Sequence, residues 1–292
     1  MAYHHMLNQA MRRSESISPY RRERMQMAEQ LRNQFAPTLR ESFFVRANSE
    51  PGLSDKRLIE GIFFIVRHGH SQANETSPLL KTVADHSIDL TDQGREQALE
   101  AGRVILKHLR RLHEGSPHSS FQRPEIQIWA SPFKRCRATA ETILSVLNDP
   151  AENLHFVDGF FQSTLLVEQN FGLFEGLSKA EIEETYPKEY AFFTKCISHG
   201  GRFYARMPLG ESRADVTQRV HQFLRIELGL GIVTPSFPTI PTVHIIVSHG
   251  VTVRCMAMLL TGETPEWCEI EPNPRNCSVR LISDGADHKY LS

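Results

Sequence analysis

Three short apolar runs along the chain predict strands that are buried on both faces. They read GIFFIV (61–66), EIQIWA (125–130) and VHIIV (243–247). A continuous apolar run of this length is typical of a strand with a layer of helices on either side. The chain shows no internal repeat, so each run is interpreted as a separate strand.

The stretches that follow these runs have the periodicity of amphipathic helices. Apolar side chains recur at helical spacing at Ala98, Ala101, Ile105, Leu109 and Leu112. Helices are predicted over residues 90–112, 131–147, 211–228 and 251–260, the last ending at Thr261-Gly262. The expected caps are Thr91, Ser131 and Ser212, with Pro132 in the first helical position.

Strands that alternate with helices predict an α/β fold. We expect a three-layer α/β/α sandwich with a mostly parallel central sheet over residues 61–292. Residues 1–60 are rich in Arg, Ser, Met and Gln and poor in large apolar side chains. That composition predicts a flexible N-terminal extension. A mitochondrial presequence is an alternative, but Glu15, Glu23 and Glu29 argue against it.

Composition excludes several classes of function. The chain is 40% hydrophobic and 23% charged, with a formal net charge of −1. This balance gives no global attraction to nucleic acid or to an anionic membrane, so neither is expected as a partner. Five cysteines form no C-x-x-C pair, which favours reduced thiols in an intracellular protein. No apolar run approaches the roughly 18 residues of a membrane span, so a cytoplasmic location is expected.

Polar side chains follow each of the three predicted strands. They are Arg67 and His68, Ser131 to Arg135, and Ser248 and His249. In parallel sheets ligands bind outside the carboxyl ends of the strands, so these side chains are expected at one edge. Two arginines and two histidines there predict a site for a phosphate dianion, because guanidinium matches phosphate oxygens two at a time. Arg135 would also lie in a first helical turn, which favours anions.

Histidine adds the possibility of covalent catalysis, because a neutral imidazole is a nucleophile. His68 would need one bare ring nitrogen, with the other bonded to a backbone carbonyl. Nearby arginines and a second histidine should disfavour the imidazolium form. Gly69 would let the chain turn without a side chain obstructing the phosphate.

The segment RHGHSQAN (67–74) resembles the R-H-G-[EQ]-S-x-x-N signature of branch 1 of the histidine phosphatase superfamily, which has the phosphoglycerate mutase-like fold. Five further blocks resemble that family's motifs in the family's order. They read DLTDQGREQA, ASPFKRCRATAETI, VEQNFGLFEG, MPLGESRADVTQRV and VSHGVTVR. One R-H-G alone would be a weak signal, but these blocks together span most of the chain after residue 60.

The resemblance implies that His68 is the phospho-acceptor and that Arg67, Arg135 and His249 hold the phosphoryl oxygens. It implies Glu168 as the acid that protonates the leaving group and as the base that later activates water. Each of these roles is the one that the family assigns to the matching residue of its motif.

Further site residues are expected by the same resemblance. Ser71, Asn74 and Gly250 are candidates for contacts with the substrate. The proton donor stays open between Glu168, which fits the motif register, and Glu175 nearby. No metal or other cofactor is expected, because no H-E-x-x-H or paired Cys/His spacing occurs. Glu211 and Arg254 are explained equally well as structural residues.

The sequence also departs from the family's pattern. His70 stands where Glu or Gln is usual, and Gln169 replaces the arginine that holds a substrate carboxylate in the family's mutases. Arg202 or Arg206 could replace that clamp, and Lys179 does resemble the mutase pattern. Since a mutase must retain its intermediate through such charge clamps and hydrolysis need not, their loss favours hydrolysis.

The sequence therefore predicts a phosphatase-type member, a metal-independent phosphomonoesterase that works through phospho-His68. Its substrate would be a small phosphorylated metabolite or a phosphoprotein. A cofactor-dependent phosphoglycerate mutase is one alternative, and a catalytically silent protein that binds phosphorylated ligands is another.

Overall fold

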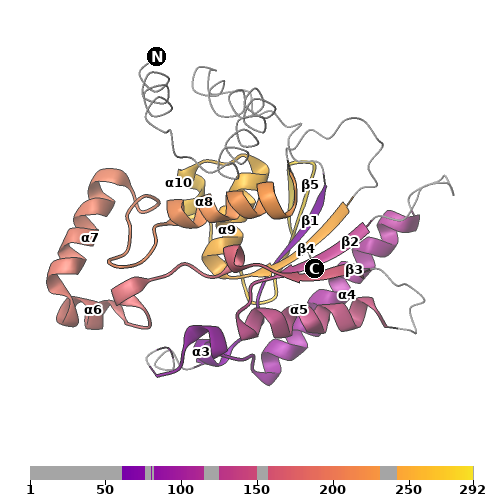
Figure 1. The fold of residues 1–292 in the computed structure, drawn as a ribbon, viewed down its shortest axis with the longest axis horizontal. Helices are drawn as coiled ribbons and strands as arrows, with labels where there is room; N and C mark the ends of the chain where they lie inside the picture. The colour runs from indigo at the N-terminus through magenta and orange to yellow at the C-terminus, as the bar shows by residue number, and fades with distance from the viewer. Residues whose placement is uncertain are drawn as a thin grey trace, which may run out of the picture. The chain divides into compact units, whose positions relative to one another are not determined.

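The computed structural model describes residues 61–75, 80, 82–114, 125–149, 157–230 and 242–291. The predicted N-terminal extension, residues 1–60, lies outside the described residues, so its boundary stays a prediction. The described part holds one central sheet with helices on both faces (Figure 1).

The sheet has six strands in the order β3-β2-β4-β1-β5-β6. Their bounds are β1 Ile62–Arg67, β2 Glu125–Ala130, β3 Val157–Gln162, β4 Thr242–Ser248, β5 Val279–Ser283 and β6 Ala286–Tyr290. β3, β2, β4 and β1 run parallel to one another, while β5 is antiparallel to both β1 and β6. The prediction of an α/β fold with a mostly parallel sheet is confirmed.

Alternate residues of the central strands face opposite layers of the core. In β1, Phe64 and Val66 pack with the helices α4 (Asp92–Glu114) and α5 (Lys134–Leu147). Phe63 and Ile65 pack on the other face with α8 (Arg213–Gln222) and α9 (Gly250–Thr261). Burying each such side chain contributes roughly 1.5–3 kcal/mol, and the two clusters hold the three layers together.

The remaining elements surround this sandwich. Helices α8 (Arg213–Gln222), α9 (Gly250–Thr261) and α10 (Pro265–Ile270) lie on the face opposite α4 and α5 (Figure 1). Helices α6 (Lys179–Thr185) and α7 (Pro187–Gly200) lie beyond the end of the sheet. The short elements are α3 Gln72–Glu75, the 3₁₀ turns η4 Asp85–Ser87, η6 Thr164–Leu166 and η7 Gly172–Phe174, and the π-helical turn η8 Phe223–Glu227.

Two of the three predicted helix caps are present. The Thr91 hydroxyl accepts the Gly94 N–H at 3.1 Å, and Ser212 forms a capping box with Asp215 at the start of α8. The third prediction is wrong: Ser131 does not cap α5, which begins at Lys134 after Phe133. Its hydroxyl instead lies 2.8 Å from His249 Nε2, so the site uses a side chain that the sequence pattern assigns to the helix.

Among the described residues, no helix combines the length and the apolar character that crossing a bilayer requires.

Candidate active site

The carboxyl ends of three neighbouring strands are level with one another. Arg67 at the end of β1 pairs with Ser248 at the end of β4. The chain continues this pairing one residue further, where the His68 N–H donates to the Ser248 carbonyl at 2.9 Å. Ser131, just after β2, donates its N–H to Val247 at 3.0 Å. The predicted convergence of the polar residues after these strands is therefore present.

We call the group formed by Arg67, His68, Arg135 and His249 the strand-end pocket. Its centre is His68, whose side chain is 5% exposed. Nδ1 lies 2.8 Å from the Gly69 carbonyl, and Nε2 lies 3.3 Å from Arg135 Nε. A guanidinium can only donate, so Nε2 is unprotonated and the proton on Nδ1 is donated to Gly69. This is the arrangement that a nucleophilic imidazole requires.

The surroundings of His68 keep its ring neutral. Burial lowers the pKa of His68 well below its usual 6.5, and the positive charge of Arg135 lowers it further. Desolvation acts on the charged form, and a like charge nearby adds to that penalty. The ring is therefore uncharged, with its Nε2 lone pair available, throughout the neutral pH range.

His249 is fully buried and is the N-cap residue of α9. Its Nδ1 accepts a hydrogen bond from Arg135 Nη2 at 3.2 Å, which leaves Nε2 to donate to the Ser131 hydroxyl at 2.8 Å. The pKa of His249 is also well below 6.5, because of burial first and then Arg135. The two histidine rings meet edge to face with centroids 5.3 Å apart.

Arg135 contacts both histidines and one carboxylate. Its Nη1 and Nη2 donate to the two carboxylate oxygens of Asp85 at 2.8 and 3.1 Å. This paired geometry is the one in which a guanidinium binds two phosphate oxygens. Asp85, in η4, therefore occupies the position that a phosphoryl group would need at Arg135. The sequence analysis did not identify Asp85, and no motif marks it.

Arg67 lies at the edge of the pocket. Nη1 donates to the Pro274 carbonyl at 2.7 Å, while the buried Nε has no hydrogen-bond partner. Burial lowers the pKa of Arg67, and the nearby charge of Glu168 opposes that change. An unpaired buried donor costs roughly 1–3 kcal/mol, which an incoming anion could recover.

Glu168 is held by backbone groups. Its carboxylate accepts the N–H of Gln169 at 2.9 Å and that of Val251, in the first turn of α9, at 3.3 and 3.4 Å. Side chains from β4 and α9 fix the preceding residues: Ser248 donates to the Leu166 carbonyl, and Thr252 donates to Val167, both at 2.7 Å.

Arg219 of α8 links the Glu168 segment to the residues before that helix. It donates to the carbonyls of Leu165 and Glu168 at 2.8 and 3.1 Å and pairs with Glu211 at 3.0 Å. Glu211 also accepts the Asn170 N–H at 2.9 Å. Of the two readings that the sequence left open for Glu211, these contacts favour the structural one.

The alternative acid, Glu175, follows η7. Its pKa is raised, mainly by burial and then by the negative charge of Asp85. Glu168 adds a smaller repulsion, and Arg135 opposes it. Both carboxylates therefore act electrostatically on the same site, so the choice between them stays open.

Ser71 and Asn74 contact each other. The Ser71 N–H and hydroxyl both donate to Asn74 Oδ1, at 3.0 and 3.1 Å, and Asn276 donates to the same oxygen at 3.3 Å. These bonds shape the loop after β1. Gly250 is the first residue of α9, where a Cβ would lie 2.3 Å from Asn273 Oδ1. Their predicted contacts with substrate stay predictions.

The structure gives a second reason for Gly69, and the predicted one stays a prediction. A Cβ on Gly69 would lie 2.4 Å from the Gly94 carbonyl oxygen at the start of α4. The absent side chain therefore permits close packing of the loop on α4. The Gly69 N–H donates to the Thr139 hydroxyl at 3.0 Å, and the Gly69 carbonyl accepts from His68 Nδ1, so both polar backbone groups of this residue are bonded.

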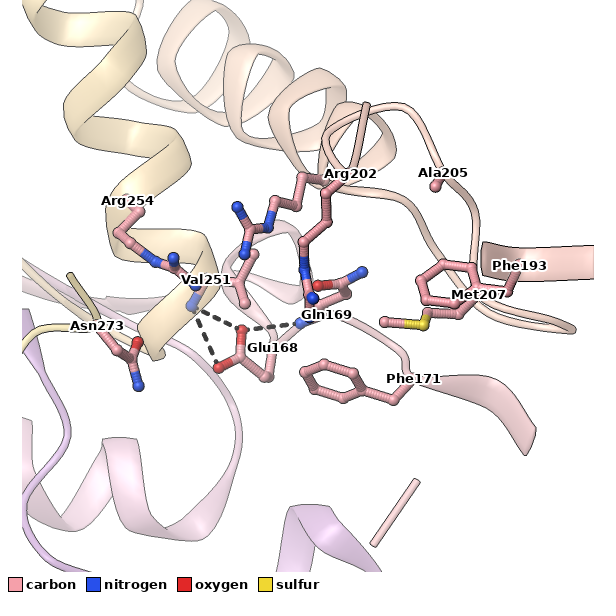
Figure 2. A pocket seen from close by; sticks show the side chains of 11 residues that line it. Glu168, Gln169, Phe171, Phe193, Arg202, Ala205, Met207, Val251, Arg254 and Asn273 are labelled. Carbon is pink, nitrogen blue, oxygen red and sulfur yellow. Dashed lines mark hydrogen bonds between the residues drawn. The ribbon is translucent and has the colours of Figure 1, made fainter. Parts of the chain in front are cut away.

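A cavity of about 190 Å³ opens beside Glu168. We call it the arginine cavity, because Arg202, Arg213 and Arg254 all line it. Figure 2 shows Glu168 between Arg254 and Asn273 on one side and an apolar group on the other. That apolar wall consists of Phe171, Phe193, Ala205 and Met207.

The residues that the sequence suggests as replacements for the missing carboxylate-binding arginine lie in different surroundings in the structure. Arg202 lines the arginine cavity. Arg206 pairs with Asp215, and Lys179 pairs with Glu183 on the exposed surface of α6. The buried side chain of Gln169 donates to the Glu211 carbonyl at 2.7 Å. His70 donates its N–H to Gln97 at 2.9 Å, which joins its loop to α4. Arg213 and Asn273, which also line the cavity, carried no signal in the sequence.

Within the described ranges, no group of three or more His, Cys, Asp or Glu side chains is placed to hold a metal ion.

Comparison with known proteins identifies the family. The model of the histidine phosphatase superfamily (branch 1) matches residues 63–291, so the chain belongs to this superfamily. The phosphoglycerate mutase-like protein AT74 of Arabidopsis thaliana is 30% identical over 241 residues, which are 81% of this chain and 69% of that protein. The family expected from the sequence motifs is confirmed.

Solved structures share the fold. The α-ribazole phosphatase of Shigella flexneri superimposes with a TM-score of 0.52 at 20% identity, covering 79% of this chain and 95% of that chain. A mycobacterial glucosyl-3-phosphoglycerate phosphatase gives a TM-score of 0.51 at 19% identity, covering 80% and 97%. Both neighbours are phosphatases, and at this level of identity the likeness shows only that the fold is shared.

Proposed function

We propose that the chain is a metal-independent phosphomonoesterase that transfers the phosphoryl group to His68. The observation that carries the proposal is the bare Nε2 of a neutral, buried imidazole beside the guanidinium of Arg135. Nε2 attacks phosphorus, the bond to the leaving oxygen breaks, and that oxygen takes a proton from Glu168. Water then attacks the phosphoryl group on Nε2, while the Glu168 carboxylate accepts its proton.

The positive groups of the strand-end pocket hold the phosphoryl oxygens during both steps. Arg135 would exchange Asp85 for the substrate, and Arg67 has an unused buried Nε–H to offer. Little else is needed, because phosphoryl transfer depends mainly on positioning and on charge stabilisation. The size of the arginine cavity supports a small phosphorylated metabolite as substrate over a phosphoprotein.

Hydrolysis is favoured over the mutase alternative by the environment of Gln169. Its buried amide is bonded to the Glu211 carbonyl and carries no charge with which to hold a phosphoglycerate. A mutase must keep its substrate bound while the phosphoryl group changes position.

The test uses the full chain with p-nitrophenyl phosphate in the presence of a chelator. His68→Asn should lower kcat by about 10⁴-fold or more, the scale seen when a covalent nucleophile is removed. His199→Asn, at an exposed position on α7, is the matched control and should keep full activity. Rapid quenching with labelled substrate should trap an acid-labile phosphoramidate that His68→Asn lacks.

Unchanged turnover in His68→Asn would reject the nucleophile. No turnover in the wild-type chain, together with tight binding of phosphorylated compounds, would support the catalytically silent alternative. Phosphate exchange between phosphoglycerates that depends on a bisphosphate would support the mutase.

A further inference from the structure

We infer that Asn276 is a positioning residue, which holds the nucleophile His68 in its reactive orientation. Asn276 lies in the loop 273–277, between α10 and β5, outside all of the sequence blocks that indicate the family. The inference rests on the proposed function, because it concerns how the imidazole of that reaction is aimed.

The side chain of Asn276 connects this loop to the segment after β1. Its amide Nδ2 donates to the His68 carbonyl at 3.0 Å and to Asn74 Oδ1 at 3.3 Å. A carbonyl can only accept, so the atom of Asn276 that faces His68 must be the nitrogen. An amide nitrogen carries two hydrogens, so it can donate to both oxygens at once.

The peptide group that joins His68 to Gly69 is held at both of its polar ends. Its oxygen, the His68 carbonyl, accepts from Asn276 and, at 3.4 Å, from the Cys277 N–H. Its N–H, that of Gly69, donates to the Thr139 hydroxyl in α5 at 3.0 Å. A peptide group is planar, so bonds at both ends fix how it is turned about the chain.

The orientation of this peptide decides whether His68 is aimed correctly. The ring Nδ1 donates to the Gly69 carbonyl at 2.8 Å, which leaves Nε2 bare. Turning the peptide would change ψ of His68 and φ of Gly69, and would move that carbonyl away from Nδ1. Glycine has no Cβ to restrict this rotation. Hydrogen bonds from other segments must therefore do so, and Asn276 and Thr139 supply them.

The 273–277 loop adopts a strained backbone at the point where it meets β1. Cys277 has a φ of 54°, in the left-handed region that is unfavourable for residues other than glycine. Its N–H donates to the Arg67 carbonyl at 3.0 Å, and the Pro274 carbonyl accepts Arg67 Nη1 at 2.7 Å. Strain of this kind persists where surrounding contacts impose it, and these contacts are made with Arg67 and His68.

The experiment measures transfer of the phosphoryl group to the protein, by rapid quenching with p-nitrophenyl phosphate. Asn276→Ala should slow this step about 10–100-fold, because a displacement of about 1 Å can cost that much. The inhibition constant of inorganic phosphate should change less than about threefold, because the guanidinium groups that bind the anion stay in place.

Three further variants separate positioning from packing. Asn276→Asp keeps the shape of the side chain but places an oxygen against two acceptors, so it should slow the step at least as much as Asn276→Ala. Arg275→Ala changes an exposed side chain of the same loop and should keep the rate within about twofold. Thr139→Val removes the bond at the other end of the peptide, so its defect combined with Asn276→Ala should be smaller than the product of the two single defects.

A wild-type rate of transfer in Asn276→Ala or in Asn276→Asp would overturn the inference. A double variant whose defect equals the product of the single defects would do the same. Loss of phosphate binding as large as the loss of rate would also overturn it, because the pocket as a whole would then be disturbed.

A spectroscopic measurement separates this inference from the proposed function. In the wild-type chain, NMR of the His68 ring nitrogens, assigned by their absence in His68→Asn, should show a protonated Nδ1 and a bare Nε2. In Asn276→Ala the two chemical shifts should move towards each other as the tautomers exchange. If the wild-type chain releases no phosphate from any ester, the proposed function fails. Unchanged shifts in Asn276→Ala would instead reject the positioning role alone.

Discussion

The strand-end pocket and the arginine cavity are both cationic, but they balance charge differently. In the strand-end pocket, Arg135 is paired with Asp85, and burial keeps His68 and His249 neutral. In the arginine cavity, the hydrogen bonds that Arg213 and Arg254 form with other described residues all go to backbone carbonyls. The first region contains a carboxylate that neutralises its guanidinium, whereas among the described residues Arg213 and Arg254 have no ion-pair partner.

The two regions also differ in how the chain builds them. The strand-end pocket comes from residues at the ends of β1 and β4 and at the starts of α5 and α9, so sheet register aligns Arg67, His68 and His249 while α5 supplies Arg135. The arginine cavity combines the segment between α7 and α8 with α9 and the loop before β5. This division is typical of enzymes whose common chemistry is built on the scaffold and whose specificity lies in variable segments.

The largest effect should come from the carboxylate at the border of the two regions. Glu168→Gln should lower kcat about 10²–10⁴-fold for an alkyl phosphate such as glycerol 3-phosphate. p-Nitrophenyl phosphate should be affected much less, because its leaving group departs without a proton. Glu175→Gln, measured with both substrates, is the matched comparison and should change kcat less than about tenfold.

A reversed result, with the alkyl-phosphate defect confined to Glu175→Gln, would move the acid role to Glu175. The raised pKa of Glu175 is the feature that such a result would use.

A smaller effect should appear in the stability of the fold at mildly acidic pH. It concerns a buried histidine that is not one of the site residues. His244 lies in β4, and burial alone lowers its pKa to about 4. Its folded pKa lies below the unfolded value of 6.5, so protons favour the unfolded chain and stability is lost as pH falls from 6.5 towards 4. His244→Leu should remove about 2 kcal/mol of the stability difference between pH 7 and pH 5.

Urea unfolding at the two pH values measures that difference. His68 and His249 should supply the rest of the acid sensitivity, and saturating inorganic phosphate should reduce only their share. An unchanged pH dependence in His244→Leu would show that this ring is protonated or hydrated in the folded protein.

The smallest effect should come from Asp85, the substitute ligand of the strand-end pocket. Asp85→Asn should tighten competitive inhibition by inorganic phosphate about fivefold, corresponding to about 1 kcal/mol for a partly exposed ion pair. Asp89→Asn, which removes a nearby surface carboxylate paired with Lys134, should leave inhibition unchanged. Weaker inhibition in Asp85→Asn would mean that Asp85 orients Arg135 instead of competing with the ligand.

The parts of the fold that could be predicted are those in which a local pattern and burial agree. β1, β2 and β4 are rich in buried apolar residues because helices cover both faces of the sheet, although β2 also carries Glu125 and Gln127. β3, β5 and β6 were not predicted. β3 and β6 lie at the sheet edges and have mixed sequences, VDGFFQ and ADHKY, that leave most of their side chains partly or fully exposed. β5 lies inside the sheet, but its five residues, VRLIS, include a buried arginine that breaks the apolar pattern. The pairing of Arg67 with Ser248, and the hydrogen bond from His68 to Ser248, bring the ends of β1 and β4 together at the strand-end pocket.

The rest of the site depends on contacts between distant segments. Asp85 pairs with Arg135, which lies 50 positions away in the sequence. Arg213 directly follows Ser212, the N-cap of α8, so a capping role explains the sequence around it as well as a role in the site does. Ser131 has the features of a helix cap, but its hydroxyl instead accepts a hydrogen bond from His249, which lies 118 positions away in the sequence. A linear pattern cannot distinguish such residues from ordinary polar ones.

Arg219 links the segment that carries Glu168 to the residues before α8. It holds the Glu168 carbonyl and, through Glu211, the residues just before Arg213. A ligand that repositions the start of α8 would therefore also shift the backbone of Glu168, the proposed proton donor. A substrate too small to contact that helix would then react slowly even at saturation, because it could not contribute binding energy to aligning the proposed acid.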